Sequence, residues 1–255
     1  MRVFITGAAN GIGKATTEKL VKNDHKVIAY DKDEGSLENL PNQVQTYEGD
    51  VEDQERLQEV MRKEVFGVLI NCAGVQKQGA VEDMSVEDFE EHIDTNYLGT
   101  VKATKAALPM IKERNGRIIN ISSVAGRLTA PFLGGYSASK HAVEGFTDTL
   151  RMEMKDTDVE VVLVEPGPIK TGFNEKGREN LKEYLPETKY SKKYKKKLEK
   201  DYSGSKVSKP AQKILKAVEA KRPRARYSTP LKYTILLKLK FLIPTSIQDY
   251  VAGNR

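Results

Sequence analysis

Residues 2–13 read RVFITGAANGIG, an apolar strand that runs directly into a glycine-rich turn. A helical pattern follows at Lys14–Asn23. Glycines at positions 7, 11 and 13 let the backbone turn tightly and come close to a pyrophosphate, which would lie at the positive end of the helix dipole. A glycine turn without a ligand is the simpler alternative. Strand, turn and helix nevertheless stand in the order that nucleotide binding requires.

Five further apolar, β-branched runs recur along the chain, separated by segments of helical length. They are Lys26–Tyr30, Val44–Glu48, Phe66–Ile70, Arg117–Ile121 and Val159–Val164. Strands that alternate with helices predict βαβ units and a mostly parallel sheet. A continuous apolar run such as Val161–Val164 is typical of a strand that is buried on both faces. We therefore expect an α/β, doubly wound Rossmann fold.

Length and composition favour one large α/β domain or two small ones. The chain has 255 residues, of which 38% are hydrophobic, enough to fill a core and to exclude disorder of the whole chain. Cys72 is the only cysteine, so internal disulfides and a structural zinc module are both excluded. His25, His92 and His141 show no metal-ligand grouping, and we expect no metal. With no basic-then-apolar leader and no apolar run of about 18 residues, we expect a soluble, cytoplasmic protein.

The net charge of +6 conceals an asymmetry along the chain. Residues 1–170 carry 20 basic and 28 acidic side chains, a net −8, whereas residues 171–255 carry 22 basic and 8 acidic side chains, a net +14. The basic part could attract an anionic substrate, a membrane surface or nucleic acid, but a solvated lysine face is the simpler interpretation. For nucleic acid there is no recognised motif. The possible stacking rings are Tyr184, Tyr190, Tyr194 and Tyr202.

The last third has a different texture. Gly172–Gly204 is polar and lysine-rich, which indicates an excursion over the domain and not a second core, and a helical pattern resumes at Pro210–Ala220. Pro230–Gly253 mixes Leu and Ile with Lys and is broken by Pro244, as expected for two short amphipathic helices. We divide the chain into a catalytic domain at 1–229, with a substrate loop at 172–204, and a C-terminal extension at 230–255.

Asp31 ends the second predicted strand. A carboxylate there can accept hydrogen bonds from the adenosine ribose hydroxyls and would repel a 2′-phosphate, which favours NAD over NADP. A turn-forming Asp is the alternative, because the following Lys32–Gly35 is turn-like. Asn10 brings no positive charge to the 2′-phosphate region, whereas Lys32 could offer one. We predict NAD as the preferred cofactor, with NADP left open.

A phenol and an ammonium stand four residues apart in YSASK, at Tyr136 and Lys140, so on a helix they share one face. The nearby positive charge is expected to lower the pKa of the Tyr136 phenol toward the range useful for proton transfer. Ser123 follows the apolar strand Ile118–Ile121, at the edge where open α/β sheets bind ligands. Taken alone, each of these residues has an ordinary structural role.

The order and spacing of these motifs resemble the short-chain dehydrogenase/reductase family. The resemblance covers about the first 170 residues and rests on several independent motifs. They are TGAANGIG at 6–13, NCAG at 71–74, Asn96, Ser123, YSASK at 136–140 and PGPIKT at 166–171. It implies hydride transfer between NAD(P) and an alcohol or a carbonyl group. It also implies a homo-oligomer, a dimer or a tetramer.

Four catalytic roles follow from the resemblance. Tyr136 would give a proton to the carbonyl oxygen in reduction, or remove it from the hydroxyl in oxidation. Ser123 would hold the same oxygen by a hydrogen bond, and the spacing of thirteen residues to Tyr136 selects it over its neighbour Ser122. Lys140 would bind the nicotinamide ribose and lower the pKa of Tyr136. Asn96 would position a water that links Lys140 to solvent.

The resemblance also implies which residues contact the cofactor. The full set is Gly7, Asn10, Gly11, Ile12, Gly13, Asp31, Asp50, Val51, Asn71, Ala73, Gly74, Tyr136, Lys140, Pro166, Ile169 and Thr171. Asp50 and Val51 match positions that hold the adenine, and Ile169 and Thr171 would contact the nicotinamide carboxamide. Cys72 departs from the family, which often has Asn there. A buried structural thiol is favoured over a reactive one.

The motifs do not specify the substrate or the partners, and the C-terminal tail gives the main indication of both. The tail at 230–253 resembles the extensions of the retinol- and hydroxysteroid-dehydrogenase-like branch, which implies a hydrophobic alcohol or ketone. Leu and Ile beside Lys also fit a peripheral membrane contact, while packing on the core or on a partner subunit is the simpler interpretation. A non-catalytic dinucleotide sensor is the alternative function. It would not need Ser123, Tyr136 and Lys140 together. An epimerase or dehydratase of the extended relatives is disfavoured, because those enzymes carry a longer substrate domain.

Overall fold

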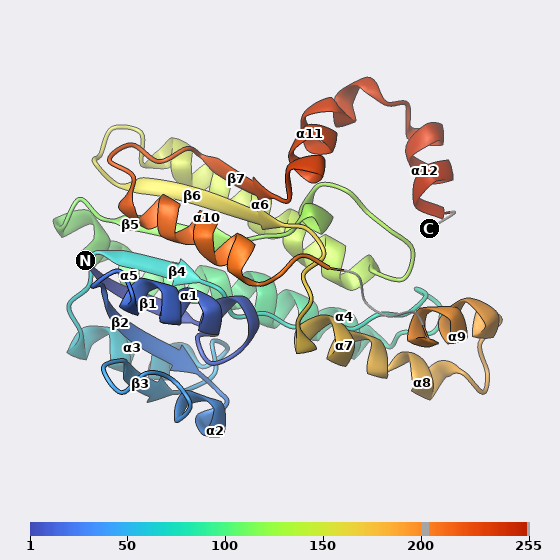
Figure 1. The fold of residues 1–255 in the computed structure, drawn as a ribbon, viewed down its shortest axis with the longest axis horizontal. Helices are drawn as coiled ribbons and strands as arrows, with labels where there is room; N and C mark the ends of the chain where they lie inside the picture. Colours follow the sequence, from blue (N-terminus) through green and yellow to red (C-terminus); the bar gives the residue numbers. More distant parts are fainter. Residues whose placement is uncertain (200–203, 254–255) are drawn as a thin grey trace.

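The computed structural model describes residues 1–199 and 204–253 and is centred on a seven-stranded sheet (Figure 1). The strands are β1 (Arg2–Thr6), β2 (Lys26–Asp31), β3 (Gln45–Glu48), β4 (Val68–Asn71), β5 (Arg117–Ile121), β6 (Glu160–Pro166) and β7 (Arg226–Thr229). All neighbouring strands are parallel, in the order β3-β2-β1-β4-β5-β6-β7. Strand order reverses between β1 and β4, which is the point at which doubly wound sheets bind ligands.

Helices cover both faces of the sheet. On one face α1 (Gly11–Val21) and α10 (Ser208–Glu219) lie side by side. The other face is covered by α3 (Gln54–Lys63), α5 (Gly99–Glu113) and α6 (Gly134–Glu153). Shorter connections complete this part of the fold: α2 (Glu34–Leu37), α4 (Val86–Glu91), the π-helix η1 (His92–Leu98) and the 3₁₀ helix η2 (Val124–Gly126).

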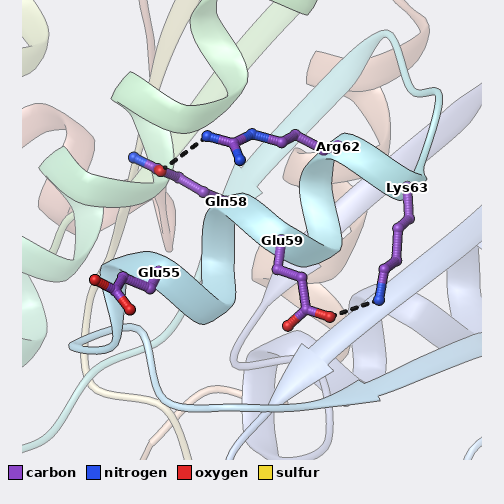
Figure 2. Close-up of a pocket in the computed structure, with 5 residues that line it drawn as sticks. All are labelled: Glu55, Gln58, Glu59, Arg62 and Lys63. Carbon is purple, nitrogen blue, oxygen red and sulfur yellow. Dashed lines mark hydrogen bonds and ion pairs between the residues drawn. The ribbon is translucent and has the colours of Figure 1, made fainter.

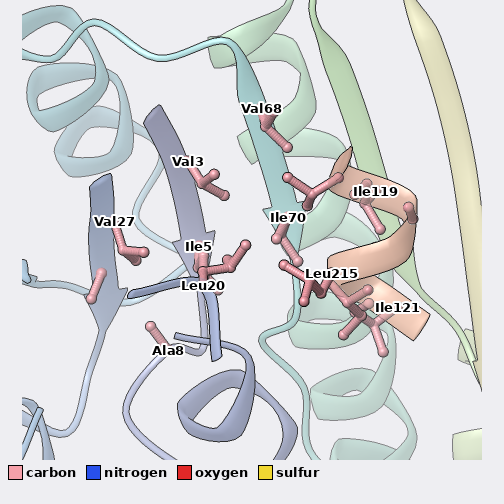
Figure 3. Close-up of a cluster of buried hydrophobic side chains, with 14 of the residues drawn as sticks. Val3, Ile5, Ala8, Leu20, Val27, Val68, Ile70, Ile119, Ile121 and Leu215 are labelled. Carbon is pink, nitrogen blue, oxygen red and sulfur yellow. The ribbon is translucent and has the colours of Figure 1, made fainter. Parts of the chain in front are cut away.

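Side chains alternate between two cores along the strands. Val3 and Ile5 of β1 pack with Leu20 of α1 and Leu215 of α10, as Figure 3 shows. Phe4, between them, points to the opposite face and packs in the core formed by α3 and α5. Successive side chains of a strand point to opposite faces, so a strand between two helical layers needs apolar residues at every position. This explains the continuous apolar runs.

The prediction of a doubly wound parallel sheet is confirmed, and all six predicted strands are present with ends shifted by at most two residues. Sequence reasoning missed β7. This edge strand has only four residues, and Arg226 and Ser228 on it donate hydrogen bonds to the buried Glu165 of β6 (2.9 and 2.6 Å). A short strand whose polar side chains face buried acids has no apolar run to reveal it.

The chain after β6 makes a helical excursion and returns. It contains α7 (Gly172–Glu179), α8 (Leu181–Tyr184) and α9 (Ser191–Glu199). Its two ends meet, since the Lys170 amide donates to the Ser205 carbonyl (2.9 Å) and Ile169 bridges to Ser205. A small separate core, with Leu181 and Tyr194 buried against Phe132, holds these helices to the domain. The excursion predicted for this segment is present.

The C-terminal extension forms an arm. It comprises α11 (Leu231–Leu239), the 3₁₀ turn η3 (Lys240–Leu242) and α12 (Thr245–Gly253), so the prediction of two short helices is confirmed. Figure 1 shows α11 at the carboxyl ends of β6 and β7, with α12 held away from the sheet. The excursion α7–α9 lies at the same end of the sheet. Within the described residues, no helix is long and apolar enough to cross a bilayer.

Candidate active site

The carboxyl edge of the sheet brings together residues from distant parts of the sequence. Parallel strands end at one edge, so the turn after β1, the loop after β4, Ser123 after β5 and Pro166 at the end of β6 become neighbours. The Cys72 amide donates to the Thr6 carbonyl (3.2 Å), which ties the loop after β4 to the end of β1. Many of the predicted site residues therefore lie along this edge of the sheet.

Glycine is required at two positions of the first turn for different reasons. Gly7 has a φ of +65°, and a Cβ there would lie 2.5 Å from the Cα of Ala73. A Cβ on Gly13 would lie 1.9 Å from the Gly7 carbonyl oxygen, so α1 can approach the turn only because this side chain is absent. At both positions the absence of a side chain lets two stretches of the protein's own backbone pack closely together.

Gly11 differs because it faces open space. Its φ is +52°, and the nearest atom to a Cβ there would be Thr171 Cγ2 at 3.9 Å. Helix α1 begins at this glycine without a side-chain cap and with no acidic residue in its first turn. Its first amide groups therefore keep hydrogen-bonding capacity for an anion, at the positive end of the helix.

The end of β2 is rich in carboxylates. Asp31 accepts hydrogen bonds from the Ala9 amide (2.8 Å) and the Asp33 amide (3.1 Å), so it is held against the glycine turn. The Asn10 side chain donates to Asp33 (3.0 Å). Lys32 forms an ion pair with Asp50 (3.1 Å), which directs its ammonium toward a neighbouring carboxylate.

Tyr136 and Lys140 lie in the first two turns of α6, where both side chains are buried. Lys140 Nζ donates to the Ile121 carbonyl at the end of β5 (3.0 Å) and lies 5.9 Å from the centroid of the Tyr136 ring. Ser123 Oγ donates to the Pro166 carbonyl (3.4 Å) and accepts from the Ala125 amide (3.1 Å). The expected grouping of serine, tyrosine and lysine is present.

Burial is the largest influence on the pKa values of Tyr136 and Lys140. It raises the pKa of Tyr136 to about 12, and hydrogen bonding with Ser123 only partly opposes the shift. It lowers the pKa of Lys140 to about 8. The expected lowering of the Tyr136 pKa is therefore not found in this structure, because removing the phenolate from water outweighs the favourable interactions. Burial also raises the pKa of the Cys72 thiol to about 12, which argues against a reactive thiol.

Asn96 lies in the π-helix η1, a rare element that is frequent at functional sites. Its side chain donates to the Val75 carbonyl (3.0 Å) and to Ser139 Oγ (2.9 Å) and accepts from the Val75 amide (2.7 Å). A Cβ on Gly74 would lie 2.9 Å from Asn96 Oδ1 and 3.6 Å from Lys140 Nζ. The amide thus fixes the loop after β4 beside the lysine.

Other predicted contacts divide into interior and edge positions. Asn71 is interior, since its amide donates to Thr104 (3.0 Å) and Asn120 (2.8 Å) within a buried polar ladder. Val51 is also buried, and a Cβ on Gly99 would lie 2.7 Å from it. Of the other residues named for the cofactor, Ile12 lies in the first turn of α1, and those at or just after strand ends are Asp50, Ala73, Pro166, Ile169 and Thr171.

Two surface hollows, one on α3 and one beside Phe132, hold none of the predicted site residues. Figure 2 shows one of about 460 Å³ on the exposed side of α3. Its charged groups pair along the helix, as in the ion pair between Lys63 and Glu59 (2.5 Å). Such pairs at a spacing of four residues are ordinary features of a solvated helix. No grouping of three or more His, Cys, Asp or Glu side chains suited to a metal occurs in the described ranges 1–199 and 204–253.

Comparison with known proteins agrees with this geometry. A family model described as short chain dehydrogenase matches residues 1–182. The NADPH-dependent 3-dehydrocapnine reductase of Ornithobacterium rhinotracheale is 35% identical, over 97% of this chain and 94% of its own length. The 3-ketodihydrosphingosine reductase of Bacteroides thetaiotaomicron is 33% identical, over 97% and 95%. The chain belongs to the short-chain dehydrogenase/reductase family.

Solved structures of the family share the fold. A short-chain dehydrogenase from Burkholderia cenocepacia J2315, solved in complex with NADP, superposes with a TM-score of 0.81 at 23% identity, over 98% of this chain and 96% of that one. As a short-chain dehydrogenase/reductase, the protein is an NAD(P)-dependent oxidoreductase that acts on alcohol or carbonyl groups. The comparisons give no support to a non-catalytic sensor.

The residues of this short-chain dehydrogenase/reductase fit a nicotinamide dinucleotide. Gly11 faces open space bounded by Thr171, and the start of α1 carries neither a cap nor an acidic side chain. Asp31 stands at the end of β2, one strand away from the glycine turn. A pyrophosphate at the first turn of α1 and ribose hydroxyls at Asp31 would use these groups.

Sequence reasoning missed three features of the short-chain dehydrogenase/reductase site. Phe173 of α7 is partly exposed, and its ring lies edge-on to that of Tyr136, with centroids 6.2 Å apart. Tyr233 of α11 contacts Gly167 in PGPIKT. Only Phe173 has a sequence signal, its position two residues after that motif. Tyr202, one of the possible stacking rings, lies outside the described residues.

The third missed feature is a partly buried charge cluster behind the site. Arg226 of β7 forms ion pairs with Glu144, Asp148 (2.5 Å) and Glu165 (2.9 Å). Arg127 pairs with the same Glu165 carboxylate (3.3 Å). Glu144 is one helical turn after Lys140, and Glu165 is directly before Pro166. The cluster therefore joins α6 and β6 below the site. No local pattern in the sequence could have paired these charges.

Proposed function

We propose that Tyr136 is the general acid and base of hydride transfer between a nicotinamide cofactor and an alcohol or ketone. The observation that carries the proposal is the grouping at the end of β5. Ser123 lies close enough to the buried Tyr136 phenol to oppose the rise in its pKa, and Lys140 Nζ lies 5.9 Å from the Tyr136 ring centroid. General acid–base groups contribute typically about 10²- to 10⁴-fold to rate. A sensor would have no use for this arrangement.

When bound, the nicotinamide supplies the hydride for reduction or accepts it in oxidation. In reduction Tyr136 donates its proton to the carbonyl oxygen, while Ser123 Oγ hydrogen-bonds to the same atom. Burial, which holds the pKa of Tyr136 at about 12, keeps the phenol protonated and ready to donate. In oxidation the phenolate accepts the hydroxyl proton, and the Lys140 ammonium stabilises that phenolate. Asn96 positions the loop at Val75 and a water that links Lys140 to solvent.

NAD is our proposed preferred cofactor. Asp31 faces the glycine turn through the Ala9 amide, and a 2′-phosphate beside this carboxylate would meet like charge. Lys32, the cation that could offset this repulsion, is paired with Asp50. One relative is named as NADPH-dependent, so both cofactors belong in every binding measurement.

The proposed substrate is a hydrophobic ketone or the corresponding alcohol. The Phe173 ring lies edge-on to that of Tyr136 and offers an apolar aromatic surface beside the phenol. The relative from Bacteroides thetaiotaomicron is named as a reductase of a ketone, 3-ketodihydrosphingosine. We further propose a cytoplasmic enzyme that forms a homo-oligomer, a dimer or a tetramer. The lone Cys72 supports a reducing compartment, and the oligomer is a family expectation.

The first experiment follows nicotinamide absorbance with NAD(H) and NADP(H) over a panel of long-chain, steroid, retinoid and short polar ketones and alcohols. Tyr136→Phe is the test variant, and Tyr97→Phe in η1 is a matched control. We expect turnover on apolar substrates that Tyr136→Phe reduces at least a hundredfold while cofactor affinity stays within a few-fold. Equal turnover by the Tyr136→Phe enzyme would refute the role of this phenol.

A further inference from the structure

The C-terminal arm carries an exposed apolar stripe. Leu231, Ile235 and Leu239 of α11 are 72%, 52% and 47% exposed, and Leu242 in η3 is 78% exposed. Their spacing of four, four and three residues places them along one side of the helix. We call these four side chains the arm stripe. Ile247 and Tyr250 of α12 add two exposed side chains, 52% and 74%, three residues apart.

The opposite side of α11 is already in use. Leu237 is buried, Tyr233 packs against Gly167, and Arg127 donates to the Leu237 carbonyl (3.3 Å). The helix is therefore apolar on two opposite sides, of which only the inner one meets the domain. A helix that is apolar all round is normally covered on all sides, and contiguous exposed apolar patches mark interaction surfaces. The arm stripe needs an outer partner.

The charges beside the stripe indicate which partner. Lys232 and Lys238 are exposed on either side of it, and Asp249 is the only acidic residue in 230–253. The last 85 residues carry 22 basic against 8 acidic side chains. A two-fold contact between copies would place the same lysine-edged stripe of both chains together, like charge against like charge. An anionic lipid surface instead satisfies both the apolar and the cationic groups.

We propose that the arm stripe seats this enzyme on anionic lipid surfaces, with Lys232 and Lys238 at the level of the phosphates. Tyr233 lies against Gly167, two residues before the predicted nicotinamide contact Ile169. Figure 1 shows the arm and the lysine-rich α9 at the same end of the sheet as the site. Resting on the proposed function, this position lets the site take a hydrophobic ketone or alcohol that resides in the bilayer.

The test is flotation of the full-length protein with vesicles of phosphatidylcholine alone or mixed with phosphatidylglycerol. One variant carries Leu231→Ser, Ile235→Ser, Leu239→Ser and Leu242→Ser together. Its matched control carries Val86→Ser and Met152→Ser, which remove exposed apolar side chains elsewhere. We expect the wild type and the control to float with anionic vesicles, and the stripe variant to bind at least tenfold more weakly. Lys232→Glu with Lys238→Glu should remove the preference for anionic lipid.

Two results would overturn the proposal. Wild-type protein that stays unbound on anionic vesicles at low salt excludes lipid docking. A wild-type dimer that the stripe variant converts to monomers, without vesicle binding, assigns the stripe to a second copy. The outcome is separable from the catalytic proposal, since Tyr136→Phe should float like the wild type. Conversely, the stripe variant should turn over a water-soluble ketone at the wild-type rate. It should lose only the higher turnover that the wild type shows on a ketone embedded in anionic vesicles.

Discussion

The ring of Tyr233 lies directly on Gly167, so close that a Cβ on this glycine would be 2.6 Å from Cδ2 of the ring. Gly167 belongs to the PGPIKT segment that leaves β6 at the site, and Tyr233 belongs to the arm helix α11. The glycine is needed here for space, because its φ is outside the left-handed region. The arm is thereby packed on a segment predicted to contact the nicotinamide.

Gly167→Ala should lower both stability and activity, because the added methyl group must displace an aromatic ring. Overpacking of this kind costs about 1–3 kcal/mol. We expect the free energy of unfolding in urea to fall by this amount, and the Michaelis constant for the cofactor to rise. The double variant Gly167→Ala with Tyr233→Ala should recover most of the cofactor affinity. If the second substitution gives no recovery, contact with the ring is not the cause.

Carbonyl reduction should decline above about pH 8. Burial lowers the pKa of Lys140 to about 8, so its ammonium is present below that pH and is lost above it. Tyr136 stays protonated throughout this range because its pKa is about 12. We expect kcat/KM for reduction to fall toward tenfold per pH unit above pH 8. In Lys140→Arg the charge persists, so the residual activity should not show this decline. A wild-type profile that is flat to pH 10 would contradict the assignment.

Gly13→Ala should impair folding, whereas Gly11→Ala should impair the binding of NAD. Gly13→Ala places a methyl group 1.9 Å from the Gly7 carbonyl and should unfold or strongly destabilise the domain. Gly11→Ala meets open space, and its φ of +52° costs only about 1–2 kcal/mol. We expect this second protein to fold, with a far-ultraviolet dichroism spectrum like the wild type, but to bind NAD at least tenfold more weakly. Equal NAD binding by folded Gly11→Ala would exclude the turn as the phosphate site.

Arg226→Met should be among the most destabilising substitutions outside the apolar cores. It leaves Glu144 and Glu165 buried without their shared cation, and breaking a buried pair costs about 3–5 kcal/mol. Lys63→Met removes an exposed ion pair with Glu59 and is the control, with an expected cost below about 1 kcal/mol. Chemical denaturation of both variants measures the difference. Similar costs would show that the cluster is solvated and contributes little.

Asp31→Ala should narrow the difference in binding affinity between NAD and NADP. Removing the carboxylate takes away acceptors for the ribose hydroxyls and the repulsion of a 2′-phosphate. We expect the dissociation constant for NAD to rise about tenfold and that for NADP to fall, as measured by equilibrium fluorescence titration. Lys32→Ala serves as the control, because that ammonium is paired with Asp50. Tighter binding of NADP than of NAD by the wild type would overturn the proposed preference.

Much of the site could be predicted because its motifs are local. The turn at residues 6–13 and the pair at Tyr136 and Lys140 each require only contiguous chain in a known element. The edge at which they meet follows from parallel strands. The pKa of Tyr136 could not be predicted in the same way. It depends on how much water the folded chain removes from the phenol, and that is set by residues distant in sequence such as Phe173.

The sequence alone determined the doubly wound sheet and the glycine turn, because apolar periodicity and motif spacing act over short stretches of chain. The choice of Ser123, Tyr136 and Lys140 as a catalytic group came from the resemblance of the sequence to its family. Only the tertiary structure decided the edge strand β7, the seating of Tyr233 on Gly167 and the cluster of Arg226 with Glu144 and Glu165. These features join segments up to about 80 residues apart. Their stability comes from burying charges and rings that no local pattern pairs.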